Sequence, residues 1–286
     1  MQDLNTKGRT HAMTVDVEDY FHVSAFDSVF TPDDWTSITP RVGDTTNRLI
    51  DLFNEHNVKA TFFTLGWVAK HCPDVVKRIV DEGHELASHG TNHRRNTTMT
   101  REQVHADIKE SKDVLEQAAG KAIIGYRAPS FSVNNSNEWV YEILAELGFI
   151  YSSSTYPIEH DLYGVPDWPR FAHKREEGII EIPIPTVRNN DKNKGIGGGG
   201  YFRLYPYWLS KRRIDAYLKD NDQPYNFYFH PWEIDADQPR VQNAPFKSKL
   251  RHYVNLHVME KKLVKLMQDY HWSSMEEVYA DVIAGK

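Results

Sequence analysis

Strand-like and helix-like segments alternate along almost the whole chain, and this alternation limits the folds open to it. Short runs rich in β-branched and aromatic residues, such as 59–65, are followed by segments with helical apolar spacing, such as 73–82. Repeated strand-then-helix units predict a parallel sheet covered by helices. The length of 286 residues favours a barrel over an open sheet. We therefore predict an α/β fold of the (β/α) barrel type.

The individual elements follow from the same periodicities. The predicted strands are 12–17, 59–65, 85–88, 125–128, 149–153, 179–184 and 225–229. The predicted helices are 42–56, 73–82, 100–119, 137–147, 208–219, 247–269 and 274–283. Thr100 and Gln103 have the spacing of a capping box, and Gly120 follows the end of that helix. The chain contains no internal repeat and no clear boundary, which predicts a single domain.

Composition excludes several classes of protein. The net charge of −6 leaves no surplus of basic residues for binding nucleic acid. A single cysteine, Cys72, excludes an intramolecular disulfide framework. No stretch reaches the roughly 18 apolar residues of a membrane span. Residues 1–10 lack the apolar core of a secretory signal, so we expect a cytoplasmic protein, although a chain with its leader removed would look the same.

A pair of histidines four residues apart, His89 and His93, is the strongest chemical signal. If they lie on one face of a helical turn, the two imidazoles can bind one ion, and a carboxylate can complete a three-ligand site with an open position. That composition suits a hydrolytic Zn²⁺. The chain has 14 histidines, so the spacing alone is weak evidence. The acidic run Asp16-Val17-Glu18-Asp19 at the end of the first strand supplies the missing carboxylate.

Four side chains that could take part in catalysis or metal binding lie at the carboxyl ends of predicted strands: Asp16, His89, Arg127 and His230. Barrel enzymes place their chemistry at this rim. An amide hydrolase needs an activated water, a base, an electrophile for the oxyanion and an acid for the leaving amine. The acidic run can supply the base and one metal ligand, and the histidine pair can supply two more ligands. His230 can supply the acid. Arg127 would lower the pKa of the base by ion pairing. Taken singly, Arg127 also fits a rim salt bridge, and His230 a packed turn residue.

The order of four motifs resembles the NodB-homology polysaccharide deacetylases. The motifs are Thr-Val-Asp-Val-Glu-Asp, Ser-His-Gly-Thr-Asn-His, Arg-Ala-Pro-Ser and a strand ending in aromatic-x-His. Further segments resemble the exosortase-associated branch, which is encoded with exopolysaccharide synthesis and export genes. They are 19–22, 126–132, 198–203, 229–233 and 251–253. The resemblance extends from about residue 12 to 270.

This resemblance implies a fold, a reaction and a substrate. The fold is a distorted (β/α) barrel with fewer than eight strands, forming a single domain over 1–286 with a family-specific C-terminal extension from about 195 onward. The reaction is metal-dependent removal of acetyl groups, with release of acetate, and the metal is a divalent ion such as Zn²⁺. The substrate is an N-acetylhexosamine unit of an oligo- or polysaccharide, or of its lipid-linked precursor. The sequence does not identify a protein partner.

The resemblance also assigns roles by position. Asp16 matches the catalytic base, and His89 and His93 match metal ligands. Arg127 matches the arginine that tunes the base. The backbone N–H of Ser130 matches an oxyanion donor, and His230 matches the acid that protonates the leaving nitrogen.

Three departures from the family pattern leave alternatives open. The usual motif has two adjacent aspartates, whereas here Val17 intervenes. Because i+2 returns to the same face of a strand, Glu18 is the expected third ligand, with Asp19 as the alternative if the strand has already turned. The aspartate that often orients the acid histidine is replaced by hydroxyls at 151–154, which leaves Glu233, Asp235, Asp161 or no residue for that task. Some relatives hydrolyse cyclic amides without a tightly held metal.

The glycine run 197–200 lacks the context of a phosphate loop. It fits either a mobile surface loop or a backbone lying close to a bound sugar. In the second case the side chains at 201–203 would line the sugar-binding groove. Aromatic rings elsewhere are equally good core residues or sugar platforms. The candidate substrate-binding residues are therefore Tyr20, Tyr201, Arg203 and Trp232. Two rival functions remain: an allantoinase-like hydrolase of small cyclic amides, and a non-catalytic glycan-binding module.

Overall fold

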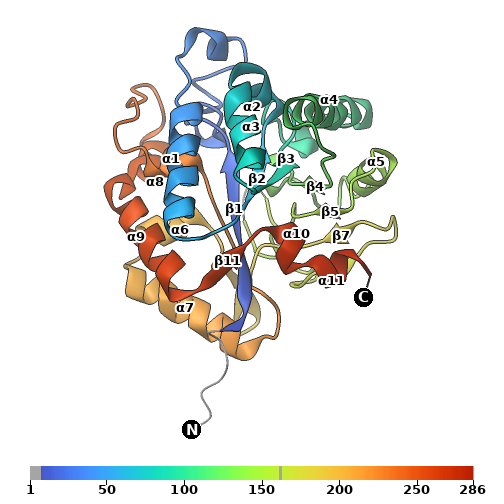
Figure 1. Ribbon diagram of the computed structural model, residues 1–286, viewed down its shortest axis with the longest axis vertical. Helices are drawn as coiled ribbons and strands as arrows, with labels where there is room; N and C mark the ends of the chain where they lie inside the picture. Colours follow the sequence, from blue (N-terminus) through green and yellow to red (C-terminus); the bar gives the residue numbers. More distant parts are fainter. Residues whose placement is uncertain (1–7, 161–162, 286) are drawn as a thin grey trace.

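Strand β1 (Thr10–Val17) is an interior strand of the sheet, and seven of its eight residues are buried. The computed structural model describes residues 8–160 and 163–285. Within these residues the sheet runs in the order β10-β1-β2-β3-β4-β5-β7-β6. Figure 1 shows this arrangement, with β1 in blue in the middle of the molecule. The remaining strands are β2 (Thr61–Thr64), β3 (Glu85–Ser88), β4 (Gly125–Tyr126), β5 (Tyr151–Ser152), β6 (His173–Lys174), β7 (Ile180–Glu181) and β10 (Asn226–Phe229).

The seven strands from β10 to β7 are all mutually parallel, and only β6 runs antiparallel, against β7. Strand β11 (His271–Ser273) pairs in parallel with the start of β1. Thus the C-terminal residues complete the same sheet that the N-terminal residues begin. A separate hairpin consists of β8 (Thr186–Asn189) and β9 (Lys192–Gly195). The predicted α/β fold of distorted-barrel type is confirmed, although the described residues form a nine-stranded sheet where fewer than eight strands were expected.

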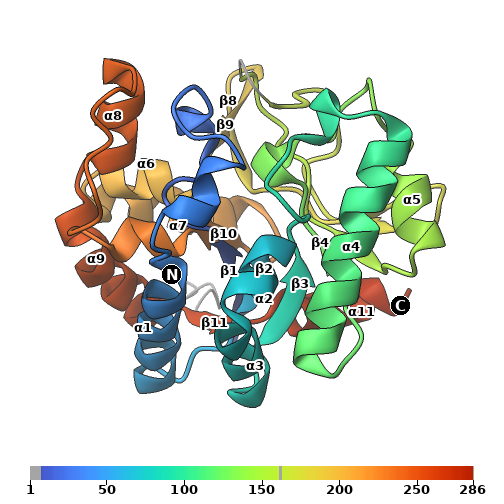
Figure 2. The same ribbon diagram turned by 90° about the horizontal axis from the view of Figure 1, so that it is seen from above.

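Helices cover the outside of this curled sheet. Figure 2 shows α1 to α5 along the side of β1 to β5, and α6 to α9 gathered towards β10. The first group is α1 (Val42–Glu55), α2 (Gly66–His71), α3 (Pro73–Asp81), α4 (Arg101–Ala119) and α5 (Val140–Glu146). The second is α6 (Gly199–Leu204), α7 (Tyr207–Asp220), α8 (Phe246–Tyr253) and α9 (Leu256–Asp269), followed by α10 (Met275–Val278) and α11 (Ala280–Ile283). None of the helices described is long and apolar enough to cross a membrane.

The predicted helix ends are confirmed where capping chemistry is explicit. Thr100 accepts a hydrogen bond from the N–H of Gln103, the reciprocal bond is also present, and Gly120 adopts a left-handed conformation (φ 68°). The single helix predicted over 247–269 is wrong, because Asn255 has φ 56° and separates α8 from α9. An isolated left-handed residue does not disturb hydrophobic periodicity, so the pattern alone conceals this break. The helix predicted over 274–283 is likewise divided, at Tyr279.

The glycine run is not a mobile loop, because Gly199 begins α6. A Cβ on Gly198 would lie 2.6 Å from the hydroxyl of Tyr228, and one on Gly199 would lie 2.3 Å from the carboxylate of Glu233. Glycine is required here by close approach rather than by a positive φ. Because these glycines have no Cβ, the start of α6 can pack closely against residues at the carboxyl end of β10.

Candidate active site

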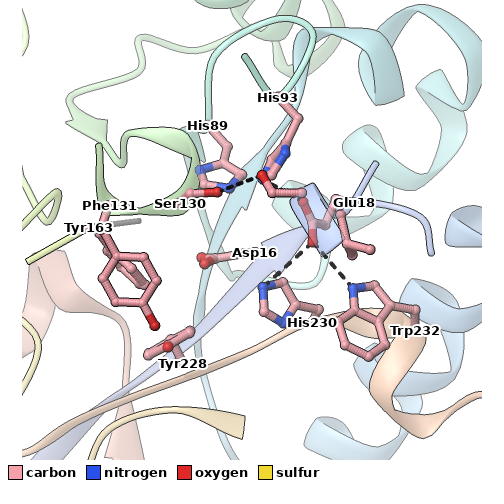
Figure 3. A pocket seen from close by; sticks show the side chains of 12 residues that line it. Asp16, Glu18, His89, His93, Ser130, Phe131, Tyr163, Tyr228, His230 and Trp232 are labelled. Atoms are coloured by element: carbon pink, nitrogen blue, oxygen red, sulfur yellow. Dashed lines mark hydrogen bonds and ion pairs between the residues drawn. The ribbon is translucent and has the colours of Figure 1, made fainter. Parts of the chain in front are cut away.

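A pocket of about 180 Å³ opens at the carboxyl ends of the parallel strands. Strand β1 contributes Asp16 and leads into Glu18, and the loop after β3 contributes His89 and His93. The turn after β4 contributes Ser130, and the end of β10 contributes Tyr228 and leads into His230 and Trp232. Figure 3 shows these side chains around one cavity. The predicted convergence of distant segments on one rim is confirmed.

Glu18, His89 and His93 form a candidate metal centre. One ligand atom from each lies within 4.8 Å of the others. Oε2 of Glu18 is buried without a hydrogen-bond partner, and its close neighbour is Nε2 of His93 at 2.7 Å. Nδ1–H of His89 donates to the carbonyl oxygen of Arg127 at 2.8 Å, which fixes the ring and leaves Nε2 for a ligand. Two imidazoles and an orphaned carboxylate oxygen fit Zn²⁺ with an open position.

The two histidines do not lie on a helical turn, contrary to the prediction. They stand in an irregular loop in which Gly90 has φ 75° and His93 has φ 50°. The N–H of Thr91 donates to the carboxylate of Asp107 at 3.0 Å, which anchors the loop to α4. The ring centroids of His89 and His93 are 5.4 Å apart. Left-handed backbone, rather than helical spacing, brings the imidazoles together.

The alternative ligand Asp19 serves a different purpose. Its carboxylate accepts hydrogen bonds from the backbone N–H groups of Tyr20 (2.8 Å), Arg41 (2.5 Å) and Val42 (2.8 Å). It therefore satisfies donors at the start of α1, which have no partner within the helix. Glu18, not Asp19, lies with the histidine pair. The chain turns only after Glu18, as the alternation from Asp16 predicts.

The surroundings shift the pKa values of the residues in this centre for different reasons. Burial alone would raise the pKa of Glu18, but the neighbouring imidazoles of His93 and His230 bring it well below its ordinary value. Burial lowers the pKa of His89 to about 4, so this ring is neutral at neutral pH. A neutral imidazole and an ionised carboxylate are the protonation states in which both can bind a cation.

Arg127 fixes the carboxylate of Asp16. Its side chain has no exposed surface, and Nη1 donates to Oδ1 of Asp16 at 2.5 Å and to the hydroxyl of Thr14 at 2.9 Å. Nε and Nη2 donate to the carbonyl and hydroxyl oxygens of Ser153. The guanidinium also lies over the ring of Phe63. Because its donors are satisfied in this way, the buried Arg127 holds the carboxylate of Asp16 in position. It does not form a surface salt bridge.

His230 is oriented by Glu233. Nδ1–H of His230 donates to Oε1 of Glu233 at 2.9 Å, and Nε2 lies 3.6 Å from Oε1 of Glu18. Burial would lower the pKa of His230, but the charges of Glu18 and Glu233 raise it to about 9. The ring is therefore protonated at neutral pH. Asp235, an alternative in the sequence, pairs instead with Arg41, and Asp161 lies outside the described residues.

Two family models match different parts of the chain. Residues 25–151 match the family model described as polysaccharide deacetylase. This part of the chain is similar to the polysaccharide deacetylase family. Residues 153–280 match a second model, described as a domain of unknown function (DUF3473). The boundary between the two matches falls directly after β5, although the strands on both sides of it belong to one sheet.

One curated relative is the peptidoglycan deacetylase of Helicobacter pylori. It is 34% identical over 107 residues, which are 37% of this chain and 36% of the relative. The chain thus spans little more than a third of the length of the curated relative it matches. A solved structure from Mycobacterium smegmatis, described as a candidate polysaccharide deacetylase, aligns with TM-score 0.66 and 18% identity over 100% of this chain and 93% of that chain. Puue allantoinase aligns with TM-score 0.61 and 14% identity, over 98% and 92%. At these identities the solved structures show a shared fold.

Three of the candidate substrate-binding residues are largely buried in contacts with other side chains. Arg203 is 2% exposed, and its Nε donates to Oε2 of Glu233 at 2.6 Å, so it supports the site from behind instead of lining a groove. Tyr20 is 5% exposed and packs edge-on against Phe21 and Phe30, so it belongs to the core.

Trp232 is the third of them. It stacks with the imidazoles of both His230 and His252, and its Nε1–H donates to Oε1 of Glu18 at 3.2 Å. The indole therefore holds catalytic neighbours in position and is not a free platform. Tyr201 is exposed and lines a hollow next to the pocket, where a substrate can reach it.

Ser130 occupies a strained position at the pocket wall. It has φ 54° and ψ 30°, a left-handed conformation that is uncommon for a residue other than glycine. Its hydroxyl lies 3.0 Å from that of Ser24, which belongs to another segment of the wall. The sequence offers Glu233 as one candidate to orient His230, but it does not predict the pairing of Glu233 with Arg203 behind that histidine. The signal available was the spacing of Glu233 three residues after His230.

Proposed function

We propose that this chain is a metal-dependent de-N-acetylase acting on N-acetylhexosamine units of a polysaccharide. The observation that carries the proposal is the shared pocket: an anchored carboxylate (Asp16), a protonated imidazole (His230) and the Glu18–His89–His93 centre all face one cavity. These are the base, acid and cation site that amide hydrolysis requires. The match of residues 25–151 to the polysaccharide deacetylase family supports the same reaction.

Glu18, His89 and His93 would hold the cation, and the donor set of two nitrogens and one oxygen favours Zn²⁺. When bound, the ion supplies Lewis acidity towards the acetamide carbonyl and the attacking water. The carbonyl of Arg127 and the indole of Trp232 keep two of these ligands in position. Such support is commonly worth about 10–100-fold in metal affinity.

Asp16 acts as the general base. It accepts a proton from the water that attacks the acetamide carbonyl carbon, while Arg127 keeps the carboxylate in one orientation. The N–H of Ser130 donates to the oxygen of the carbonyl as negative charge develops there. His230 then donates its Nε2 proton to the nitrogen as the C–N bond breaks. The products are acetate and a free amino sugar.

Glu233 acts on this reaction through His230. Its hydrogen bond to Nδ1 aims Nε2 at the pocket, and its charge keeps the imidazolium protonated until the leaving nitrogen requires the proton. We also propose that the chain belongs to the exosortase-associated branch and acts in exopolysaccharide synthesis. The segments 198–203 and 229–233, which support that assignment, contain Arg203 and Glu233, the pair that braces His230.

The test is acetate release by the purified chain from N-acetylglucosamine oligomers, before and after chelation and with zinc added back. We expect release that chelation abolishes and zinc restores. Ring opening of allantoin without acetate release would replace the proposal with the cyclic-amide activity. Binding of the oligomers without any acetate release would indicate a glycan-binding module.

A further inference from the structure

A second hollow adjoins the catalytic pocket. This hollow, the lateral groove, has a volume of about 480 Å³ and is lined mainly by Tyr163, Tyr201, Leu204, Tyr228, Leu250 and Arg251. Tyr163 and Tyr228 also line the catalytic pocket, so the two hollows share a wall. Figure 3 shows both tyrosines on the side of the pocket away from Trp232. A substrate bound in the pocket can therefore continue into the groove.

The groove is apolar along α6 and α8. Leu204 is 51% exposed and Leu250 is 57% exposed, and Phe246, one turn earlier on α8, is 79% exposed. Large apolar side chains gathered at a surface mark a binding site for an apolar ligand. Among the described residues that line the groove, none has a carboxylate or carboxamide side chain. The polar groups of the lining are tyrosine hydroxyls, His160 and Arg251, while Leu204, Leu250 and Val254 offer contacts to an apolar chain.

The lining of the lateral groove includes a cation, Arg251. Arg251 is exposed, and within residues 8–160 and 163–285 no carboxylate forms an ion pair with it. Burial raises the pKa of the Tyr163 hydroxyl to about 12, and the nearby charge of Arg251 acts in the opposite direction. Arg251 thus lies close to a residue that both hollows share. A guanidinium in this position matches the geometry and charge of a phosphate group.

We propose that the lateral groove binds the lipid phosphate part of the substrate. The acetamido sugar occupies the catalytic pocket, its phosphate meets Arg251, and the first part of its apolar chain lies between Leu204 and Leu250. The substrate class is a lipid-linked N-acetylhexosamine phosphate. This inference rests on the deacetylase function proposed above and narrows its substrate.

The experiment compares two substrates on the full chain loaded with zinc: N-acetylglucosamine joined through phosphate to a decyl chain, and the N-acetylglucosamine trimer. We expect L204N, L250N and R251Q each to lower the ratio of the two kcat/KM values, lipid over trimer, by about tenfold. The matched control is I150N, because Ile150 is 41% exposed and does not line the groove. This control should leave the ratio unchanged.

An equal fall in kcat/KM for both substrates would make the groove a saccharide subsite, and unchanged kcat/KM values for both substrates in all three groove variants would leave it without a role. Either result overturns the inference. Calorimetric binding of decyl phosphate, below its micelle concentration, needs no turnover. Binding that L250N weakens about tenfold, without acetate release from either substrate, would support the groove and refute only the deacetylase function. Absence of binding to the unsubstituted chain would refute the groove itself.

Discussion

Oε1 of Glu233 lies 2.9 Å from Nδ1 of His230, three residues earlier in the chain. Both side chains sit in the turn that follows β10, and the same carboxylate also accepts a hydrogen bond from the backbone N–H of His230. On its other side, Glu233 pairs with the buried Arg203. The acid of the proposed reaction is therefore held by an ion pair that reaches into α6.

The pH profile should report the Glu233–His230 contact. His230 donates a proton, so kcat should fall as pH rises through its pKa, which its neighbours raise to about 9. A cation held by Glu18 would offset part of that carboxylate's charge, so we expect the alkaline limb at or below this value. In E233Q the limb should move to lower pH, because a negative charge that favours the imidazolium is removed. A limb at the same pH in both proteins would refute the role of Glu233.

Replacing Asp16 should separate chemistry from metal binding. We expect D16N to lower kcat by about 10²–10⁴-fold, the usual contribution of a general base. Asparagine keeps an oxygen that can accept from Arg127, so the fold and the metal content should be preserved. Acetate release and zinc content measured on the same sample provide the check. Substantial turnover in D16N would exclude Asp16 as the base.

Two neighbouring acidic residues should respond differently to loss of charge. E18Q should weaken zinc binding, since Glu18 belongs to the Glu18–His89–His93 centre. D19N should keep zinc but destabilise the protein by about 1 kcal/mol, because Asp19 caps the start of α1. Zinc titration and urea unfolding of the two variants are the measurements. Loss of zinc in D19N with retention in E18Q would reverse the ligand assignment.

The glycines at the start of α6 offer a matched pair. G199A places a Cβ 2.3 Å from Oε1 of Glu233, which cannot retreat because it is held by both His230 and Arg203, so we expect a loss of about 1–3 kcal/mol. G200A meets nothing within 4 Å and should stabilise α6 by about 0.5–1 kcal/mol. Urea unfolding compares them. Equal effects would show that helix propensity, not contact with Glu233, governs both sites.

The Arg203–Glu233 pair should matter far more for stability than an exposed pair. Both side chains are buried, so R203M leaves an unpaired carboxylate and should cost about 3–5 kcal/mol. The control is K77M, which removes an exposed pair with Asp81 on α3 and should cost less than about 0.5 kcal/mol. Thermal unfolding measures both. A small effect of R203M would show that Glu233 is protonated or solvated in the folded protein.

The sequence alone determined the fold class and most of the site. Local patterns carry that information: alternation identifies strands, helical spacing identifies helices, and both place Asp16, His89, Arg127 and His230 at strand ends. Parallel strands bring their carboxyl ends to one edge, so residues far apart in the chain were predicted to meet. The period of two along β1 also favoured Glu18 over Asp19 as the residue beside the histidines.

Tertiary structure alone decided which partner each polar side chain takes. Glu233 and Asp235 are equally plausible partners of His230 in the sequence, yet Asp235 pairs with Arg41, and Glu233 contacts His230 with the buried Arg203 behind it. Left-handed residues such as His93 and Asn255 likewise redirect the chain without altering its hydrophobic pattern. The physical reason is competition. A buried charge or backbone group bonds to whichever partner the folded chain brings near, and that partner comes from a segment that local spacing does not specify.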